Sequence, residues 1–506
     1  MTVLRALIGN RTRRVRSRSR DDGLRRTGKV TGLCVRGGYV IAEDFAAVAD
    51  IHVDGAGRIA GVGECAHESG ETLDASGAVV MPGCFDAHTH IRSPGYPERE
   101  DVESGTLAAL VGGVTSFVEM PMADRGTCTA ERVRERSDLF SRGSYADFAF
   151  FGAGGQGALP EIPAMAAEGV LGFKSFLRPP YPGREVSFEG ATVEREEGLD
   201  QVARAIARTG LPWLVHAENV HLKAAASPPP AGQPQAPDRA GAPGGGVGAA
   251  AQPPVADRVS AETLAEVDGV RTAIAYARAT GARLHVVHVT AADSLREIAQ
   301  SQVDVNVTCE VCLPHLALIA GDDERYGPLA LVSPAAKRAA DRDALWHGVE
   351  LGSVCSIASD HASFAPHEYE DLLEGRTHGA LGIPSLEHLV PLTLSLALDR
   401  GVSARSVVAA LTARPARRFG MWPRKGSLSV GADADLVVLD TTTPTRIHRE
   451  ALVSKGGYTP FDGWPLRYRV QGVLTRGRVG VWDGEVNADP GWGERLRPLP
   501  RTGTGA

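Results

Sequence analysis

The chain has few aromatic residues, no excess of positive charge, no long hydrophobic run and an odd number of cysteines. Its 506 residues are 43% hydrophobic but only 6% aromatic, and 54 Lys and Arg stand against 61 Asp and Glu, a formal charge of −7. This charge gives no general attraction to nucleic acid or anionic lipid. A membrane-spanning helix needs about 20 consecutive apolar residues, and no segment supplies them. The sequence therefore predicts a protein that binds neither nucleic acid nor membrane.

Seven cysteines in so long a chain argue against a secreted fold held together by disulfides, so we expect the protein in the reducing cytoplasm. Cys309 and Cys312 have the spacing of half a zinc site or of a redox pair. No second pair follows them, and they do not open a strand–helix–strand unit. Buried structural thiols are the interpretation that we favour.

Two segments have the composition of disordered chain. Residues 1–27 carry nine Arg, but acidic residues follow them where a secretion signal would need an apolar stretch. We expect a disordered Arg-rich arm, with a targeting or nucleic-acid-binding arm as the alternative. Residues 227–254 contain eight Pro, six Gly and seven Ala, too little apolar surface to offset the entropy of ordering. We predict a disordered insertion there, with a domain boundary as the alternative.

Two segments near the ends of the chain have the residue pattern of β-strands. Residues 28–80 alternate apolar and polar positions with glycine punctuation, which is typical of short antiparallel strands and hairpins. A similar alternating pattern occurs elsewhere only in residues 420–486. We expect both segments to form one small β-sandwich domain, with residues 487–506 as a tail.

Between these ends, over residues 81–419, short apolar runs alternate with longer segments of helical period. This alternation predicts an α/β fold with parallel strands, and eight such runs favour a closed (β/α)8 TIM-type barrel over an open sheet. The eight strand candidates are Cys84–His90, Thr115–Met120, Phe148–Phe151, Leu171–Leu177, Trp213–His216, Leu284–Val289, Val303–Thr308 and Val354–Asp360.

Metal-ligand residue types stand at the ends of these strand candidates, the positions that face the active site in such a barrel. His88 and His90 are two apart, so their side chains leave the same side of an extended strand. His216, His288 and Asp360 each end a strand of their own. Imidazole is the commonest protein ligand for zinc-like metals. Each histidine alone has a structural explanation, but together these residues predict a metal centre.

Lys174 lies within the apolar run Leu171–Leu177. Burying an ammonium group is costly unless it is paired or neutralised, and burial lowers the pKa of a lysine. A neutral amine can react with carbon dioxide to give a carbamate that could bridge two metal ions. A lysine that reaches the barrel rim to pair with an acid is the alternative.

Several motifs in combination resemble the amidohydrolase superfamily, and within it the cyclic-amide branch of dihydroorotase, allantoinase and dihydropyrimidinase/hydantoinase. The resemblance spans roughly residues 28–486, interrupted by the insertion. The motifs are Pro82–Gly95, Gly112–Thr115, Glu119–Pro121, Gly172–Lys174, Val215–Asn219, His285–Thr290, Ser359–His361 and Gly431–Val437.

The resemblance implies a hydrolase acting on non-peptide C–N bonds in purine or pyrimidine metabolism. It implies two divalent metal ions, zinc before others, and a bridging hydroxide that attacks the amide carbonyl. Asp360 would pass the hydroxide proton to the leaving nitrogen, giving a ring-opened carbamoyl or ureido acid. The ligands would be His88, His90 and Asp360 for the more buried metal, His216 and His288 for the more exposed one, and carboxylated Lys174 as the bridge.

The resemblance also implies two substrate contacts. Arg92 matches the dihydroorotase position that pairs with a substrate carboxylate, a role suited to a guanidinium group. Pairing of Arg92 with Glu98 or Asp101 is the alternative. Ser333 lies in a segment that contacts the substrate amide in relatives.

Other positions depart from the family patterns. Met122 stands where dihydroorotases have an asparagine, and Pro179 stands where hydantoinases have a tyrosine that Tyr181 would replace only with a shifted loop. Leu313 departs from a segment common near the pocket. The leading hypothesis is a dihydroorotase- or allantoinase-like enzyme. A hydantoinase or dihydropyrimidinase, an enzyme of a specialised pathway, and a non-catalytic scaffold homologue are the alternatives. We expect a small cyclic amide or ureide as the substrate and a homo-oligomer, dimer or tetramer.

Overall fold

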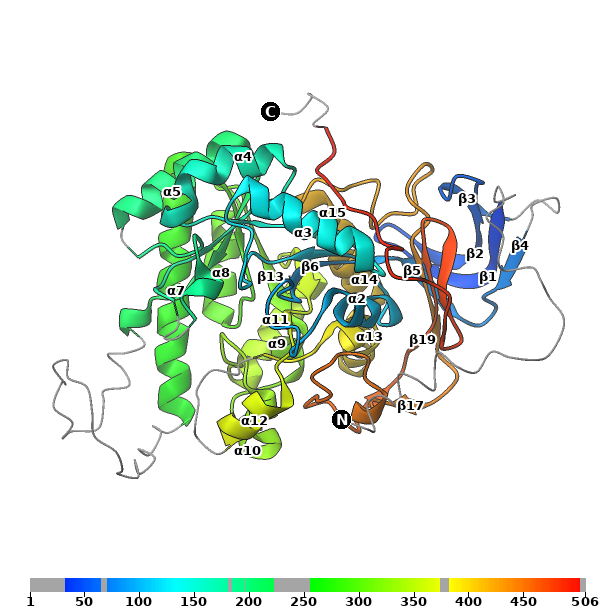
Figure 1. Cartoon of the computed structure of the whole chain (residues 1–506). Helices are drawn as coiled ribbons and strands as arrows, with labels where there is room; N and C mark the ends of the chain where they lie inside the picture. Colours follow the sequence, from blue (N-terminus) through cyan, green and yellow to red (C-terminus); the bar gives the residue numbers. More distant parts are fainter. Residues whose placement is uncertain are drawn as a thin grey trace.

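The computed structural model describes residues 32–64, 71–180, 184–194, 196–222, 255–373 and 382–500 (Figure 1). The predicted Arg-rich arm and the insertion at 227–254 lie outside these residues. In the described part of the chain, no helix combines the length and the apolar character needed to cross a membrane.

One body of the molecule is a nine-stranded sheet made from both ends of the chain, as predicted (Figure 1). The two ends join where Val80 pairs with Val438 in antiparallel register. β4 and β5 pair with β1 in parallel, so the expectation of antiparallel strands was wrong for these two. The strands are β1 (Leu33–Ile41), β2 (Ala46–Val53), β3 (Ile59–Gly63), β4 (Glu71–Asp74), β5 (Val79–Pro82), β16 (Leu436–Asp440), β19 (Arg469–Thr475), β20 (Arg478–Trp482) and β21 (Glu485–Val486).

The second body is a barrel of eight parallel strands, two of which are interrupted. β8 pairs with β7 and its continuation β9 pairs with β10, and likewise β14 pairs with β13 and its continuation β15 pairs with β6. These two changes of partner close the ring. The strands are β6 (Cys84–His90), β7 (Val114–Glu119), β8 (Asp147–Phe150), β9 (Gly152–Ala153), β10 (Phe173–Phe176), β11 (Pro212–His216), β12 (Arg283–Val286), β13 (Val307–Cys312), β14 (Ser356–Ala358) and β15 (His361–Ala362).

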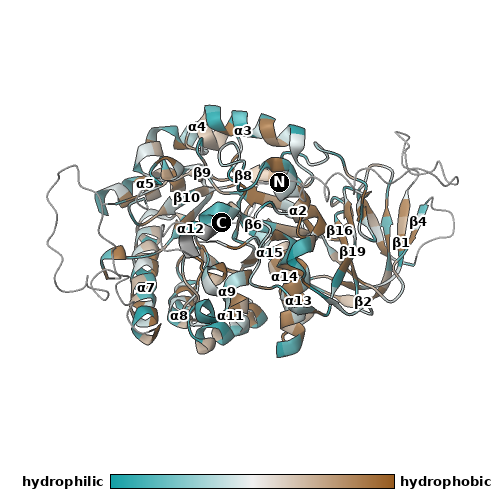
Figure 2. Ribbon diagram, turned by 60° about the horizontal axis from the view of Figure 1, so that its bottom comes forward, coloured by the Kyte–Doolittle hydropathy of each residue, from teal (hydrophilic) through white to brown (hydrophobic). Residues whose placement is uncertain are grey.

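Helices surround the barrel, and Figure 2 shows hydrophilic and hydrophobic residues mixed along outer helices such as α3, while strand β16 is mainly hydrophobic. The helices are α2 (Val102–Val111), α3 (Ala130–Gly143), α4 (Ile162–Ala167), α5 (Glu196–Thr209), α7 (Val255–Thr280), α8 (Ala292–Ser301), α9 (Leu313–Ala317), α10 (Asp322–Tyr326), α11 (Ala339–Leu351), α12 (Pro366–Leu373), α13 (Leu389–Arg400), α14 (Ala404–Leu411) and α15 (Ala413–Arg418).

The seventh barrel strand starts four residues later than predicted. The alternating run that begins at Val303 reads as a strand, but Val303 is 89% exposed and precedes β13. Cys309 and Cys312 lie in β13 as buried free thiols, which agrees with the structural interpretation. Cys34 in β1 is disulfide-bonded.

A buried charged cluster joins the two bodies. The Nζ atom of Lys425 lies 2.5 Å from Asp147 of β8, 2.9 Å from Asp433 and 2.7 Å from Asp435, just before β16. Arg476 also pairs with Asp147. Three carboxylates at such spacing can hold a metal ion, but here the ammonium of Lys425 already lies among them and arginines such as Arg476 supply further positive charge.

Candidate metal centre and active site

Three of the predicted ligands converge where the first and last barrel strands meet. His88 and His90 stand at the end of β6, and their Nε2 atoms are 3.2 Å apart. Each Nε2 atom lies 3.3 Å from Oδ1 of Asp360. Asp360 occupies the break between β14 and β15, where the last strand changes partner. Three donor atoms of these types, so close together, are able to hold one metal ion.

The other two predicted histidines form a second pair next to the first group. Nδ1 of His216, at the end of β11, lies 2.9 Å from Nε2 of His288, which follows β12. The ring centroids of His88 and His288 are 5.4 Å apart. The two groups are therefore close enough to act as neighbouring sites.

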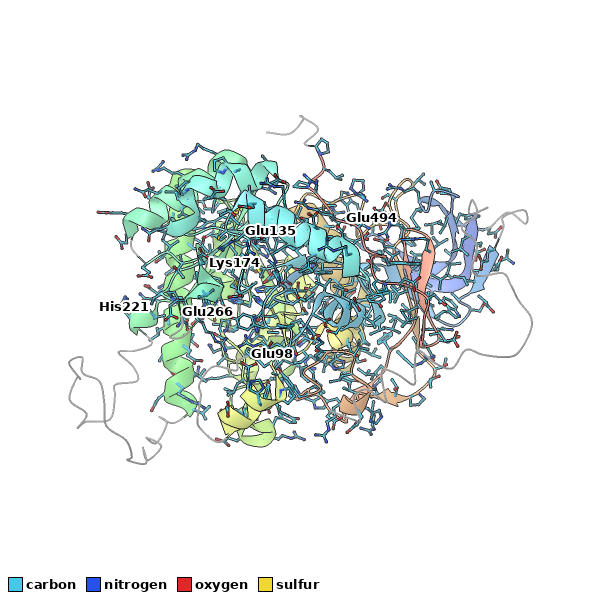
Figure 3. The ribbon with its side chains drawn as sticks, in the orientation of Figure 1. Glu98, Glu135, Lys174, His221, Glu266 and Glu494 are labelled. Atoms are coloured by element: carbon cyan, nitrogen blue, oxygen red, sulfur yellow. The ribbon has the colours of Figure 1, made fainter. Side chains whose placement is uncertain are left out.

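Lys174 of β10 is buried inside the barrel body (Figure 3). Its Nζ atom has no hydrogen-bond partner among the described residues and lies 5.0 Å from the centroid of the Phe176 ring. It interacts electrostatically with Asp360 of the first group and with His216 and His288 of the second. Lys174 therefore lies beside both groups, and it does not reach the rim to pair with an acid.

Burial sets the charge state of these groups. It lowers the pKa of Lys174 to about 8, against the opposing effect of Glu310 and Asp360. Burial likewise lowers the pKa of His90 to about 3 and brings the pKa of His288 well below its ordinary value. Neutral imidazoles, one carboxylate and an orphaned amine form a donor set that fits divalent cations and does not fit a purely structural core.

The backbone around the centre adopts a conformation that is uncommon for non-glycine residues. His288 has φ 37°, Asp360 has φ 48° and Arg92 has φ 63°. Left-handed φ values cost free energy in residues with a Cβ atom, and they cluster where a fold imposes them at functional sites. Here the strain accompanies residues whose side chains must leave their strand ends in a particular direction.

Comparisons with known proteins identify the family. Residues 79–480 match the model of the amidohydrolase family. The chain belongs to the amidohydrolase family. It is 32% identical to an L-hydantoinase from Paenarthrobacter aurescens over 84% of this chain and 89% of that protein. It is also 32% identical to an allantoinase from Rubrobacter xylanophilus, over 93% and 98% of the two chains.

Solved structures give the same assignment for the fold. An L-hydantoinase (dihydropyrimidinase) from Arthrobacter aurescens superposes with a TM-score of 0.82 at 29% identity, covering 92% of this chain and 99% of that one. A D-hydantoinase (dihydropyrimidinase) from Thermus sp. gives 0.77 at 26% identity over the same shares. The (β/α)8 barrel with a sheet domain from both chain ends is thus the fold of this amidohydrolase.

Glu310 is a site residue of this amidohydrolase that the sequence interpretation missed as a participant. It lies in β13, fully buried, and its carboxylate contacts Nδ1 of His88 and lies 3.2 Å from Nε2 of His285. Burial would raise the pKa of Glu310, but His88 and His285 outweigh it and hold the pKa below its usual range. A carboxylate on Nδ1 fixes the His88 ring so that Nε2 faces the centre. The sequence feature that could have identified Glu310 is a charged residue within an otherwise largely apolar strand.

Asp86 ties the first strand to the last. Its Oδ1 atom accepts hydrogen bonds of 3.1 Å from the backbone N–H groups of both His88 and Ser359. Burial raises the pKa of Asp86 to about 6, although these hydrogen bonds oppose it. Asp86 therefore positions both strand ends that supply the first group of ligands.

Arg92 follows the histidine pair and does not pair with Glu98 or Asp101 in the way the alternative required. The side chain of Asp101 contacts Lys455 instead. The Arg92 guanidinium carbon lies 4.8 Å from the centroid of the Phe364 ring, and Nη1 is buried with no hydrogen-bond partner in the described structure. Burial, with help from Arg99 and Arg184, lowers its pKa to about 9.

Ser333 is half-buried beside a histidine that the sequence interpretation did not single out. The carbonyl oxygen of Pro334 lies 2.8 Å from Nε2 of His315, and His315 interacts electrostatically with Asp360. Among the departures from the family pattern, Met122 is buried and Pro179 is exposed. Tyr181 lies outside the described residues.

A mainly apolar cavity of about 370 Å³ opens near this site. Tyr326, Tyr369 and Tyr458 line it together with Leu329. The hydroxyl of Tyr458 accepts a hydrogen bond of 3.2 Å from the backbone N–H of Phe364. One residue that lines the cavity is thus hydrogen-bonded to the backbone of Phe364, whose ring lies against Arg92.

Proposed function

We propose that the protein is a metal-dependent hydrolase that opens the C–N bond of a cyclic amide. The observation that carries this proposal is the convergence of six ligand-type residues, one an unpartnered buried lysine, at the ends of five barrel strands. Membership of the amidohydrolase family and similarity to proteins named L-hydantoinase and allantoinase support it.

The donor set would hold two cations. His88, His90 and Asp360 would bind one, His216 and His288 would bind the other, and carboxylated Lys174 would lie between them. We propose zinc, since neutral imidazole and carboxylate are ligands that zinc accepts. When bound, such cations polarise an amide carbonyl and acidify water.

Asp360 is the residue placed to move the proton. Burial would raise its pKa, but His88 and His90 outweigh this effect and lower it, so Asp360 is ionised near neutral pH. Its carboxylate would accept a proton from the attacking water and deliver it to the departing ring nitrogen. The water oxygen then bonds to the carbonyl carbon, the C–N bond breaks, and the nitrogen leaves with the transferred proton.

On the substrate side, we propose that Arg92 binds a substrate carboxylate and that Ser333 contacts the amide. The buried and unpartnered Nη1 atom of Arg92 supports the first role. The position of Ser333 next to the Pro334–His315 hydrogen bond supports the second. We further propose that the enzyme acts in the cytoplasm as a homo-oligomer, dimer or tetramer, which light scattering would test.

The decisive experiment is a substrate panel of hydantoins, dihydropyrimidines, allantoin and dihydroorotate, run after reconstitution with zinc, manganese or cobalt and with carbon dioxide supplied. We expect turnover of at least one ring and close to two metal ions per chain, as the six ligands require. Lys174→Ala should abolish turnover. A purified protein without bound metal or turnover, or full activity in the Lys174→Ala variant, would contradict the proposal and favour a non-catalytic scaffold.

A further inference from the structure

One helix, α7, contacts both loops that carry the second pair of histidines. His216 ends β11 and His288 follows β12, and the ends of these parallel strands open on the face of the barrel that holds the metal centre. In the chain, α7 stands between the two strands (Figure 1). The contacts come from its middle turns, between Ala265 and Gly269. A single element therefore borders both ligand-bearing loops.

Glu266 of α7, labelled in Figure 3, binds the loop after β12 through its carboxylate. Its Oε1 atom accepts hydrogen bonds from the backbone N–H groups of Thr290 at 3.0 Å and of Ala291 at 3.1 Å, and its Oε2 atom accepts one from the Thr290 hydroxyl. Glu266 and Thr290 are both buried. A buried carboxylate is costly unless such donors surround it. These bonds therefore fix the chain immediately after His288.

The backbone of His288 needs support of this kind. Its φ is 37°, in the left-handed region that residues with a Cβ atom rarely adopt. Toward the barrel interior, its N–H donates a long hydrogen bond of 3.4 Å to Oε1 of Glu310. A strained conformation persists only where the surrounding structure imposes it. The shorter bonds to Glu266 supply that constraint from the helix side.

The same helix also fixes the loop after His216. Nδ2 of Asn219 donates to Oδ2 of Asp268 at 2.8 Å. Gly269, the next residue of α7, lies directly against the backbone of this loop, and a Cβ atom there would lie 2.6 Å from the carbonyl carbon of Ala217. That distance is shorter than van der Waals contact permits. Glycine therefore lets α7 approach this loop more closely than a residue with a side chain could.

The first group of ligands is held from within the barrel. Asp86 of β6 binds the backbone of His88, and Glu310 of β13 binds its ring. We infer that α7 positions the second pair of histidines, with Glu266 as the main positioning residue, so that one of the two cations depends on this helix. This inference rests on the proposed function, in which the second pair binds its own cation. Glu266 acts through the backbone of the loop.

The test counts the zinc ions that the full-length holoenzyme retains as a chelator is added. His288→Asn, which removes a ligand of the second pair, defines the result for a protein with one intact site. In Glu266→Ala the affinity for one zinc ion should fall about 10–100-fold, the usual effect of losing an outer partner of a metal site. The other zinc ion should be retained as in the wild type. Glu266→Gln should restore part of the loss, because its amide oxygen still accepts from the two N–H groups.

Gly269→Ala tests the inference without removing a buried hydrogen-bonding group, and so it also serves if Glu266→Ala does not fold. Alanine favours a helix more than glycine does, but its methyl group would push α7 away from the loop after His216. The same zinc ion should therefore bind more weakly. Asp257→Asn is the matched control, because Asp257 is exposed in the first turn of the same helix, and it should retain both ions.

Two results would overturn the inference. One is retention of both zinc ions at the wild-type affinity in Glu266→Ala, or in Gly269→Ala if the first variant does not fold. The other is an equal fall in affinity for both ions, which would mean that α7 supports the whole centre and not the second pair. Wild-type protein that binds no zinc and opens no ring would instead contradict the proposed function.

Discussion

At the residue scale, the chemistry of the centre depends on groups whose charge burial has altered. Lys174 has an ordinary pKa of 10.5, which burial lowers to about 8. The histidines beside it are neutral for the same reason. Burial in the barrel thus favours the neutral forms of the amine and the imidazoles. These are the forms that react with carbon dioxide or bind a metal ion.

The rate of Lys174 carboxylation should rise with pH in the metal-free protein. With a pKa of about 8, the reactive neutral amine grows from about 1% of the population at pH 6 to about half at pH 8. We expect activity to return faster at the higher pH when metal-free protein receives zinc and the same dissolved carbon dioxide concentration at each pH. Reactivation that is equally fast at pH 6, or faster there, would show that amine deprotonation does not limit the process.

Glu310 should control metal affinity through His88. Glu310→Gln removes the negative charge that orients the His88 ring, and loss of such an outer partner typically lowers metal affinity or activity about 10–100-fold. Competition with a chelator, read out as zinc retained per chain, would measure this effect. Glu297→Gln is the control, because Glu297 makes a largely exposed pair with Arg271. Equal zinc retention in the two variants would remove Glu310 from the metal centre.

The ligand residues could be predicted from the sequence because each carries a local signal. His88, His216 and Lys174 are polar residues within or at the end of short apolar runs, and a parallel barrel gathers such strand ends on one face. The role of Glu310 had no local signal of that strength. It depends on contact with His88, 222 residues earlier in the chain, and one sequence does not show which strands face each other.

At the element scale, the alternation of strands and helices predicted the barrel correctly, but the starting residue of one strand was predicted wrongly. Alternating valines from Val303 mimic a half-buried strand, but β13 is buried along most of its length and begins at Val307. Fully buried parallel strands lack alternation, so a nearby alternating run is the more conspicuous candidate.

Helix α3 is fixed to the active-site face through Arg136. This buried guanidinium binds Glu119 at the end of β7 as well as the carbonyl oxygens of Ser93 and Met120. Arg136→Met leaves Glu119 buried and unpaired, so the free energy of unfolding in urea should fall by about 3–5 kcal/mol. Adding Glu119→Gln should recover part of that loss.

Arg134 on the same helix is the control for this prediction. It is largely exposed and pairs with Glu168, so Arg134→Met should cost about 0–1 kcal/mol. If Arg136→Met were as mild, the buried ion pair would not hold the loop that carries Arg92.

At the scale of the whole molecule, a buried charged cluster connects the sheet domain to the barrel. The sequence identified the Gly431–Val437 motif as part of the family resemblance. It did not reveal that aspartates of this motif contact Lys425. Lys425 and Asp147 are 278 residues apart in sequence. Their contact appears only once the barrel and the sheet have been placed against each other.

Lys425→Met should therefore destabilise both bodies together. The substitution leaves Asp147, Asp433 and Asp435 close to one another without their central ammonium, and the loss of one partner of a buried ion pair costs about 3–5 kcal/mol. Lys455→Met, which removes a partly exposed partner of Asp101, should cost about 0–1 kcal/mol. The free energies of unfolding of the two variants, measured in urea, test this difference. Hydrogen exchange should show β5, β16 and β8 losing protection in parallel in Lys425→Met, because the cluster links Asp147 of β8 to Asp435, which directly precedes β16, and β16 pairs with β5. Lost protection confined to one body, or a cost no greater than in Lys455→Met, would mean that apolar packing alone joins the sheet to the barrel.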